Sequence, residues 1–299
     1  MSGLINIKNS IRNFCRKNDE YVMPLLKLIW TLTVFVTIRI LFGYSGLMDK
    51  PVVIVLMAIL TAVLPDGFLF FMVGVVIAVH SFSVSLESGA VFIVLFILIY
   101  CFYVRFFPKY AYAVMLLLVC YLFHLEYAAP IIIGLVAGIG GVVPAACGVV
   151  LYYFADALRT VNSLATSSAE ADQLKAIETL ANTFLNNKEM YSAIVTAAIT
   201  VLVIGIIKKL SFDYSVYAAI GVGALANILA AILSGFIFSI NVNLPAIAVG
   251  SLIGVAAALL VRLGMGVLDY KHTEHVEYED DDYYYYVKAI PKDNCENID

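Results

Sequence analysis

Long apolar runs, separated by short polar clusters, follow one another from residue 21 to residue 267. The runs are continuous and do not alternate apolar with polar positions, as the strands of a transmembrane β-barrel would. A helix needs about 20 apolar residues to cross the hydrocarbon core of a bilayer. The pattern therefore predicts an all-α fold, a polytopic transmembrane helical bundle with roughly eight to ten membrane segments, several of them short or broken by Pro or Gly.

The polar clusters divide the chain into parts with different expected roles. These are a cytoplasmic amphipathic N-terminal segment (1–20), a first transmembrane bundle (21–158), a polar, external helical loop (159–190), a second transmembrane bundle (191–267) and an acidic, tyrosine-rich cytoplasmic tail (268–299). Within the tail, residues 274–279 and 283–288 fit two β-strands around an acidic turn, but the composition also fits a disordered tail.

Two of the apolar runs are interrupted by glycine and proline. The run 51–84 is broken near Pro65, which indicates either one kinked helix or two short helices joined by a tight turn. The run 130–157 is broken between Gly140 and Pro144. Membrane helices tolerate such breaks where neighbouring groups satisfy the freed backbone, and broken helices are typical of transporter binding sites.

Composition defines the solvent of the protein and excludes several kinds of site. Hydrophobic residues make up 63% of the chain and charged residues 13%, whereas a soluble domain is about a quarter charged; a lipid bilayer is therefore the first expected partner. The net charge of −4 includes no basic stripe for nucleic acid. The five cysteines form no CxxC pair, and no enzyme motif is present, so we expect no catalytic residue, metal site or cofactor.

Basic residues near the ends of the runs predict the orientation, because cytoplasmic loops carry an excess of Lys and Arg. Such residues occur in the first 20 positions, at Arg105, at Lys208 and Lys209, and at Arg262. We therefore expect a multi-pass protein of the cell (cytoplasmic) membrane with both termini in the cytoplasm.

Charged residues next to the apolar runs are the candidates for a substrate or ion site. Asp66 follows Pro65 and precedes Gly67, so it is either an ion-binding carboxylate at a broken helix or part of a surface turn. Arg39 lies deeper and either pairs with Asp66 or extends its side chain to the interface. His124 and Glu126 fit a proton relay, and Asp156 lies near a helix end; interfacial, solvated side chains are the alternative for all three.

Two functions from different classes fit these features. The first is a small transporter or transporter-like subunit with a polar site at the broken helices; the similarity of residues 59–70 to 228–238 would fit an internal repeat. The second is a membrane scaffold or assembly subunit that recruits a protein partner, or a second copy of itself, through the tail or the 159–190 loop. The candidate partner-binding residues of the tail are Tyr283, Tyr284, Tyr285 and Tyr286.

Overall fold

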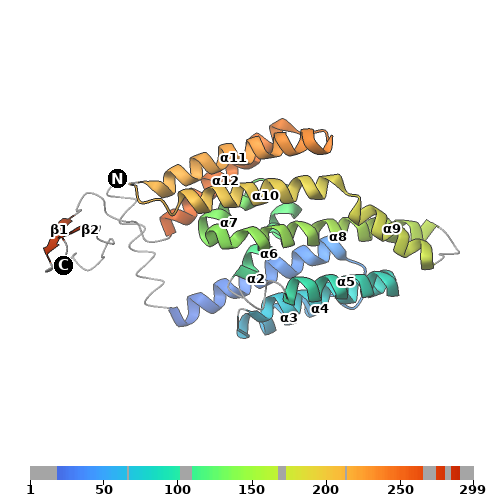
Figure 1. The fold of residues 1–299 in the computed structure, drawn as a ribbon. Coiled ribbons are helices and arrows are strands. Elements are labelled where there is room, and N and C mark those ends of the chain that lie inside the picture. Colours follow the sequence, from blue (N-terminus) through green and yellow to red (C-terminus); the bar gives the residue numbers. More distant parts are fainter. Residues whose placement is uncertain are drawn as a thin grey trace.

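The computed structural model describes residues 19–65, 67–101, 110–167, 173–212, 214–264, 274–279 and 284–289. Helices account for nearly all of these residues, and most of them lie side by side along one common direction as an elongated bundle (Figure 1). The all-α prediction is confirmed for the body of the protein.

The helices follow the apolar runs in chain order. They are α2 (Asp19–Phe42), α3 (Pro51–Val63), α4 (Gly67–Val84), α5 (Leu86–Ile99), α6 (Ala111–Leu122), α7 (Ala129–Ala137), the 3-10 turn η3 (Gly138–Gly141), α8 (Val142–Ser167), α9 (Gln173–Leu185), α10 (Lys188–Ile207), α11 (Ser215–Phe238) and α12 (Leu244–Gly264).

Six apolar helical segments among the described residues are long enough to cross a membrane, and α3, α5 and α6 are shorter apolar helices. Their outer surfaces are apolar as well: Val63, Phe236 and Leu260 are 82%, 79% and 69% exposed. Such a surface requires lipid as its solvent, so the chain is an integral membrane protein.

The interrupted run 51–84 forms two helices, α3 and α4, and the single kinked helix is wrong. Proline lacks the N–H that would continue the helix, and the residue before it is driven out of the helical region; Leu64 is accordingly extended, with φ −76° and ψ 160°. Residues 228–238, in contrast, lie within the unbroken helix α11. The similarity to residues 59–70 therefore does not extend to the local structure.

The second interruption reverses the chain. Gly138 has φ +60°, a conformation that favours glycine, and η3 then leads into α8. A Cβ atom on Gly141 would lie 2.7 Å from the Cγ2 of Ile133, which shows that the chain folds back on α7. Thus α7 and α8 are two helices that run in opposite directions, and α8 alone has 26 residues.

The first transmembrane bundle was expected to end at residue 158, but no helix ends there. Helix α8 continues without a break to Ser167, because residues 157–167 contain no proline or glycine. The polar segment that follows includes α9, which projects at one end of the bundle (Figure 1). We call this the α9 end.

The tail contains a two-stranded antiparallel sheet. Strand β1 (Glu274–Glu279) pairs with β2 (Tyr284–Ala289), and Tyr278 lies opposite Tyr285. Of the two alternatives for the tail, the strands are confirmed, with β2 one residue later than expected. In Figure 1 the sheet lies beyond the end of the bundle that is opposite to α9.

Candidate functional site

Helices α6 and α7 form a short antiparallel hairpin. Residues from the start of α6 (Tyr112, Ala113) and from the end of α7 (Val136, Ala137) line the same small apolar pocket, so the two helices pack side by side in opposite directions. With 12 and 9 residues, they extend for only about 18 Å and about 14 Å. The loop 123–128 that joins them therefore lies inside the bundle rather than at its end.

Contacts with α11 and α12 fix the depth of this loop. The Nδ2 of Asn227, near the middle of α11, donates a hydrogen bond of 2.8 Å to the backbone carbonyl of Tyr127. On the middle of α12, a Cβ atom on Gly254 would lie 2.9 Å from the Cα of Ala128. The small residue at position 254 thus lets the loop pack directly against the helix, level with the middle of both neighbours.

Buried hydroxyl and amide groups surround the anchored loop. Besides Tyr127, Asn227 hydrogen-bonds to Ser251 through Nδ2 (3.0 Å), and its Oδ1 accepts from Thr200 (3.0 Å). Asn227 is 0% exposed, so its amide would be costly without these partners. Asn227 of α11 therefore connects the hairpin loop, α10 and α12 through its hydrogen bonds.

A second polar group continues this network toward the α9 end. Ser234 of α11 shares hydrogen bonds with Ser192 (2.7 Å) and with Thr196 (3.1 Å) of α10. The two helices approach closely along this line. A strip of polar groups consequently follows the α10–α11 contact from the hairpin loop outward.

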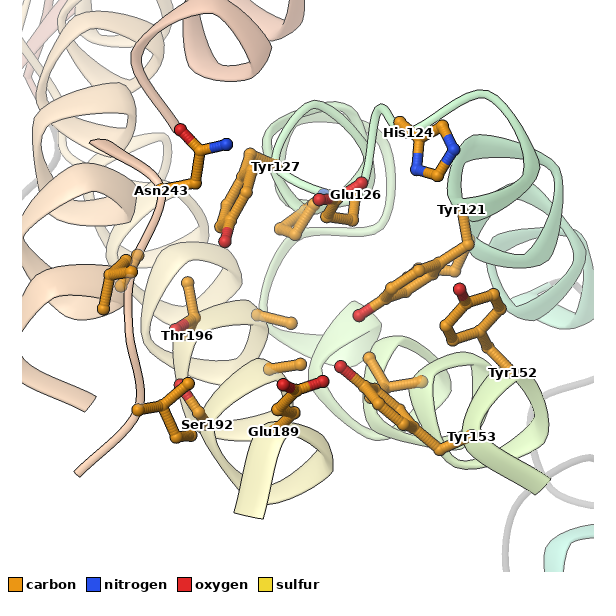
Figure 2. A pocket seen from close by; sticks show the side chains of 18 of the residues that line it. Tyr121, His124, Glu126, Tyr127, Tyr152, Tyr153, Glu189, Ser192, Thr196 and Asn243 are labelled. Carbon is orange, nitrogen blue, oxygen red and sulfur yellow. The ribbon is translucent and has the colours of Figure 1, made fainter. Parts of the chain in front are cut away.

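A cavity of about 380 Å³ lies above the loop and is bounded by α6, α8, α10 and α11 (Figure 2). Its polar lining residues come from the loop, from α8, from the start of α10 and from the segment between α11 and α12. They are Tyr121, His124, Glu126, Tyr127, Tyr152, Tyr153, Asp156, Glu189, Ser192, Thr196, Asn227, Asn241 and Asn243.

The mouth of the cavity lies at the α9 end. Glu189 is in the first turn of α10 and also lines a shallow depression next to α9. Four of the nine residues that line this depression are asparagines, and all but Ile240 are polar or charged; the asparagines are Asn182, Asn186, Asn187 and Asn241. Solvent therefore has a polar path from the α9 end to the depth of the hairpin loop.

Three tyrosines form one wall of the cavity. Tyr121 at the end of α6 stacks on Tyr152 of α8, with ring centroids 4.1 Å apart, and Tyr153 meets both rings edge-on at 6.1 Å and 5.3 Å. Aromatic pairs in these geometries are favourable beyond their buried area. The wall is therefore pre-organised by its own packing.

Of the five predicted substrate- or ion-site residues, the structure brings three together. His124, Glu126 and Asp156 all line the cavity. His124 has φ +54° at the end of α6, which is a strained conformation for a non-glycine residue. Among the described residues no hydrogen bond joins His124 to Glu126, so the geometry contains no direct proton relay between them.

The other candidates lie elsewhere. Arg39 is exposed in the last turn of α2. Asp66 lies outside the described residues, and its neighbour Leu64 accepts a hydrogen bond from Lys27 at the opposite end of α2. Arg39 is twelve positions further along α2 than Lys27, a rise of about 18 Å. Whether Arg39 pairs with Asp66 or extends to the interface stays a prediction.

The tail tyrosines are remote from the cavity. Tyr284, Tyr285 and Tyr286 lie on β2 and are 72%, 46% and 78% exposed, while Tyr283 lies outside the described residues. The β1–β2 sheet lies beyond the end of the bundle that is opposite to α9 (Figure 1), whereas the cavity lies between α6, α8, α10 and α11.

Sequence analysis missed Glu189 and the tyrosine wall. Glu189 begins an apolar run, where an acid is ordinarily an N-terminal helix residue with no further role. Tyr121 lies 31 positions before Tyr152 in the sequence, and its meeting with the Tyr152-Tyr153 pair depends on the parallel packing of α6 and α8. Only the Tyr152-Tyr153 pair one turn before Asp156 was a visible signal.

Comparison of the chain with protein-family models, with curated proteins and with solved structures finds no match.

Proposed function

We propose that the protein is a small transporter or transporter-like subunit that binds a polar solute in the cavity above the α6–α7 loop. The observation that carries the proposal is the depth of a polar, solvent-connected site: its floor, the Tyr127 carbonyl and Asn227, lies level with the middle of α11. Polar groups are costly at that depth in a bilayer and are typically retained for binding or transport. Short helices that end inside the membrane are a recurrent way to build such sites.

In this proposal α6 and α7 form a re-entrant hairpin that enters and leaves on the same side. Helices α2, α3, α4, α5, α8, α10, α11 and α12 each cross the bilayer. The shortest of them, α3, has 13 residues, and thinning of the bilayer or tilting of neighbours accommodates such a short span at modest cost. An even number of crossings places both termini on one side.

We assign the end opposite to α9 to the cytoplasm because the basic residues of positions 1–20 precede α2 in the sequence, and cytoplasmic segments carry an excess of Lys and Arg. Among the described residues, Lys27, Lys208, Lys209 and Arg262 lie toward that end, and Arg39, Lys50, Arg159 and Lys188 lie toward the α9 end. The cavity then opens to the outside of the cytoplasmic membrane, together with α9. A solute would reach the site from that side.

Cysteine accessibility tests this proposal. In a background without the five native cysteines, Ala193→Cys and Thr196→Cys place thiols on the cavity side of α10. We expect both to react with a membrane-impermeant, charged methanethiosulfonate added to the outside of intact cells. The matched control is Ile199→Cys, on the same helix but 40% exposed on the outer surface of the bundle, which lipid should protect.

If Ala193→Cys and Thr196→Cys are as unreactive as Ile199→Cys from both sides of the membrane, the cavity is closed to water and the proposal fails. Reaction only from the cytoplasmic side would reverse the proposed orientation. A scan with one reagent therefore separates the two parts of the proposal.

A specific feature of the tail favours a second candidate function, recruitment of a protein partner. Strand β2 exposes Tyr284, Tyr286 and Val287, and a two-stranded sheet has unpaired edges that can accept another strand. Replacing Tyr284 and Tyr286 by Ser should release such a partner in crosslinking and pull-down experiments, without changing thiol labelling of the cavity. Unchanged recovery of every crosslinked protein would contradict this function.

A further inference from the structure

We propose that the solute bound in the cavity is a small protonated amine. This inference rests on the proposed function, because it assumes that a solute enters the cavity. It assigns to that solute a positive charge, N–H donors and a small size, each from a separate feature of the lining.

The charge follows from the lining residues. Three carboxylates, Glu126, Asp156 and Glu189, face a cavity to which the described residues contribute no lysine or arginine. Arg159 hydrogen-bonds to the Tyr44 side chain and donates to the carbonyl of Ile40 at 3.4 Å, and its charge also acts on Tyr152 of the cavity wall. Lys188 lines the outer depression. A cleft lined by one sign of charge concentrates ions of the opposite sign, so the site favours a cation over an anion.

The N–H donors follow from Tyr121. Its side chain is only 7% exposed, and its hydroxyl points into the cavity (Figure 2). No other residue in the described part of the chain forms a hydrogen bond with this hydroxyl. The hydroxyl faces the cavity and is available to accept a hydrogen bond from a bound solute, and an ammonium group there would supply the donor.

Two further hydroxyls converge on the same space. Figure 2 shows those of Tyr127 and Tyr153 pointing into the cavity, and both lie close enough to Glu189 for an electrostatic interaction. Tyrosine rings also attract cations through their faces. Carboxylates and tyrosines together form a site that can hold an ammonium group by charge, hydrogen bonds and aromatic contact.

Size and geometry separate an amine from a metal ion. The cavity of about 380 Å³ corresponds to roughly a dozen water molecules, which is more space than a bare ion needs and suits a molecule of a few carbon atoms. Among the described residues, no group of three or more His, Cys, Asp or Glu side chains is close enough to hold a metal ion. Glu126, Asp156 and Glu189 therefore line a cavity without lying close enough together to coordinate one ion.

Charge selectivity of thiol labelling tests the inference. At Ala193→Cys, the rate with a trimethylammonium-ethyl methanethiosulfonate is divided by the rate with the sulfonato-ethyl analogue. The same ratio at Leu47→Cys, 69% exposed in the turn between α2 and α3, corrects for intrinsic reactivity. We expect the corrected ratio to favour the cation by about tenfold, and to fall toward one in Glu126→Gln and Glu189→Gln.

Glu178→Gln is the matched control, since it makes the same chemical change on the exposed face of α9. It should leave the corrected ratio unchanged. A competition experiment then identifies the ligand class: 1-aminobutane should slow labelling of Ala193→Cys, whereas 1-butanol and butyrate, of similar length but neutral and anionic, should not. Tyr121→Phe should weaken protection by 1-aminobutane more than protection by tetramethylammonium, which has no N–H.

The outcomes separate this inference from the proposed function. Three results would overturn the inference and show an open cavity that does not select an amine. The first is labelling of Ala193→Cys by both reagents with a corrected ratio near one. The others are protection by butanol or butyrate equal to that by 1-aminobutane, and no protection by any of the three. If neither reagent reaches Ala193→Cys while Leu47→Cys reacts, the proposed function itself fails. Selectivity that survives both glutamate substitutions would also overturn the inference.

Discussion

Helices α2 to α5 and helices α10 to α12 pack against their neighbours through different kinds of side chains. Aromatic packing is prominent between α2 and α5: Phe70 stacks on Phe96 at 5.2 Å, and Phe92 contacts both Phe96 and Phe154 of α8. Buried polar side chains of this region bond to the backbone: Thr31 donates to the carbonyl of Ala58, and His80 accepts from the backbone N–H groups of Tyr44 and Ser45. The pocket beside His80 has a volume of only about 10 Å³.

Between α10, α11 and α12 the contacts include serine, threonine and asparagine. Ser234, Asn227 and Ser251 are each at most 1% exposed and hydrogen-bonded, and the cavity lies beside them. In lipid, helix association depends on close packing and interhelical hydrogen bonds because the lipid chains are as apolar as leucine. The described residues that line the cavity come from α6 to α8, α10, α11 and the segments that join them, and none comes from α2 to α5.

The largest effect is expected in the aromatic region. Phe92→Ala removes a side chain that is 1% exposed and should lower the free energy of unfolding by about 3 to 5 kcal/mol, because the cavity left behind cannot collapse. Denaturation of the purified protein in mixed micelles measures this change. Labelling of Ala193→Cys in the folded fraction should stay the same.

The matched control for this substitution is Phe71→Ala, since Phe71 is 43% exposed on the outer surface of the bundle. It should have a much smaller effect on unfolding. Altered cavity labelling in Phe92→Ala would show that the two regions are not independent.

An intermediate effect is expected from the polar region. Asn227→Leu removes the bonds to Tyr127, Thr200 and Ser251 and should lower the free energy of unfolding by about 2 kcal/mol, since interhelical hydrogen bonds in membranes contribute up to about 1.7 kcal/mol each. It should also change the labelling rate of Thr196→Cys, because the hairpin loop loses its tie.

Ser251→Ala provides the graded comparison, because it removes only one of these bonds. Its effects on unfolding and on labelling should both be smaller than those of Asn227→Leu. Equal labelling rates in Asn227→Leu and the parent would mean that the loop is held by apolar packing alone.

The smallest effect concerns pH. Lys208, just beyond the end of α10, donates a hydrogen bond of 2.6 Å to the carbonyl of Leu135 in α7. Burial, and to a lesser degree the charge of Arg262, lower the pKa of Lys208 below its usual 10.5. Between the lowered pKa and 10.5 the unfolded chain binds more protons than the folded protein, so stability should rise with pH across that interval.

Replacing Lys208 by Met should flatten this rise in the pH dependence of unfolding, whereas Lys209→Met, at an exposed position, should not. Because Lys208 is only partly buried, the change is expected to be small. An unchanged slope in Lys208→Met would assign the pH dependence to other groups.

Prediction from the sequence succeeded where a single segment decides the outcome. The apolar runs, the break near Pro65, the break near Gly140 and the strand β1 are all local properties, and each is present in the structure. His124, Glu126 and Asp156 are candidates because a charged residue next to an apolar run is unusual by itself; the structure places all three in the lining of one cavity, and their role as a site stays a prediction. Glu189 was missed because an acid in the first turn of a helix is common.

The amino-acid sequence by itself determined that this chain is a helical membrane protein, because the length and continuity of apolar runs fix the solvent and the element type. Tertiary structure alone decided that α6 and α7 stop level with the middle of α11, that three tyrosines form one wall, and that three carboxylates face one cavity. The physical reason is that apolar helices of similar composition have no strongly preferred neighbour in lipid. Their arrangement depends on a few close approaches, such as Gly254 against Ala128, and on a few buried hydrogen bonds, such as those of Asn227.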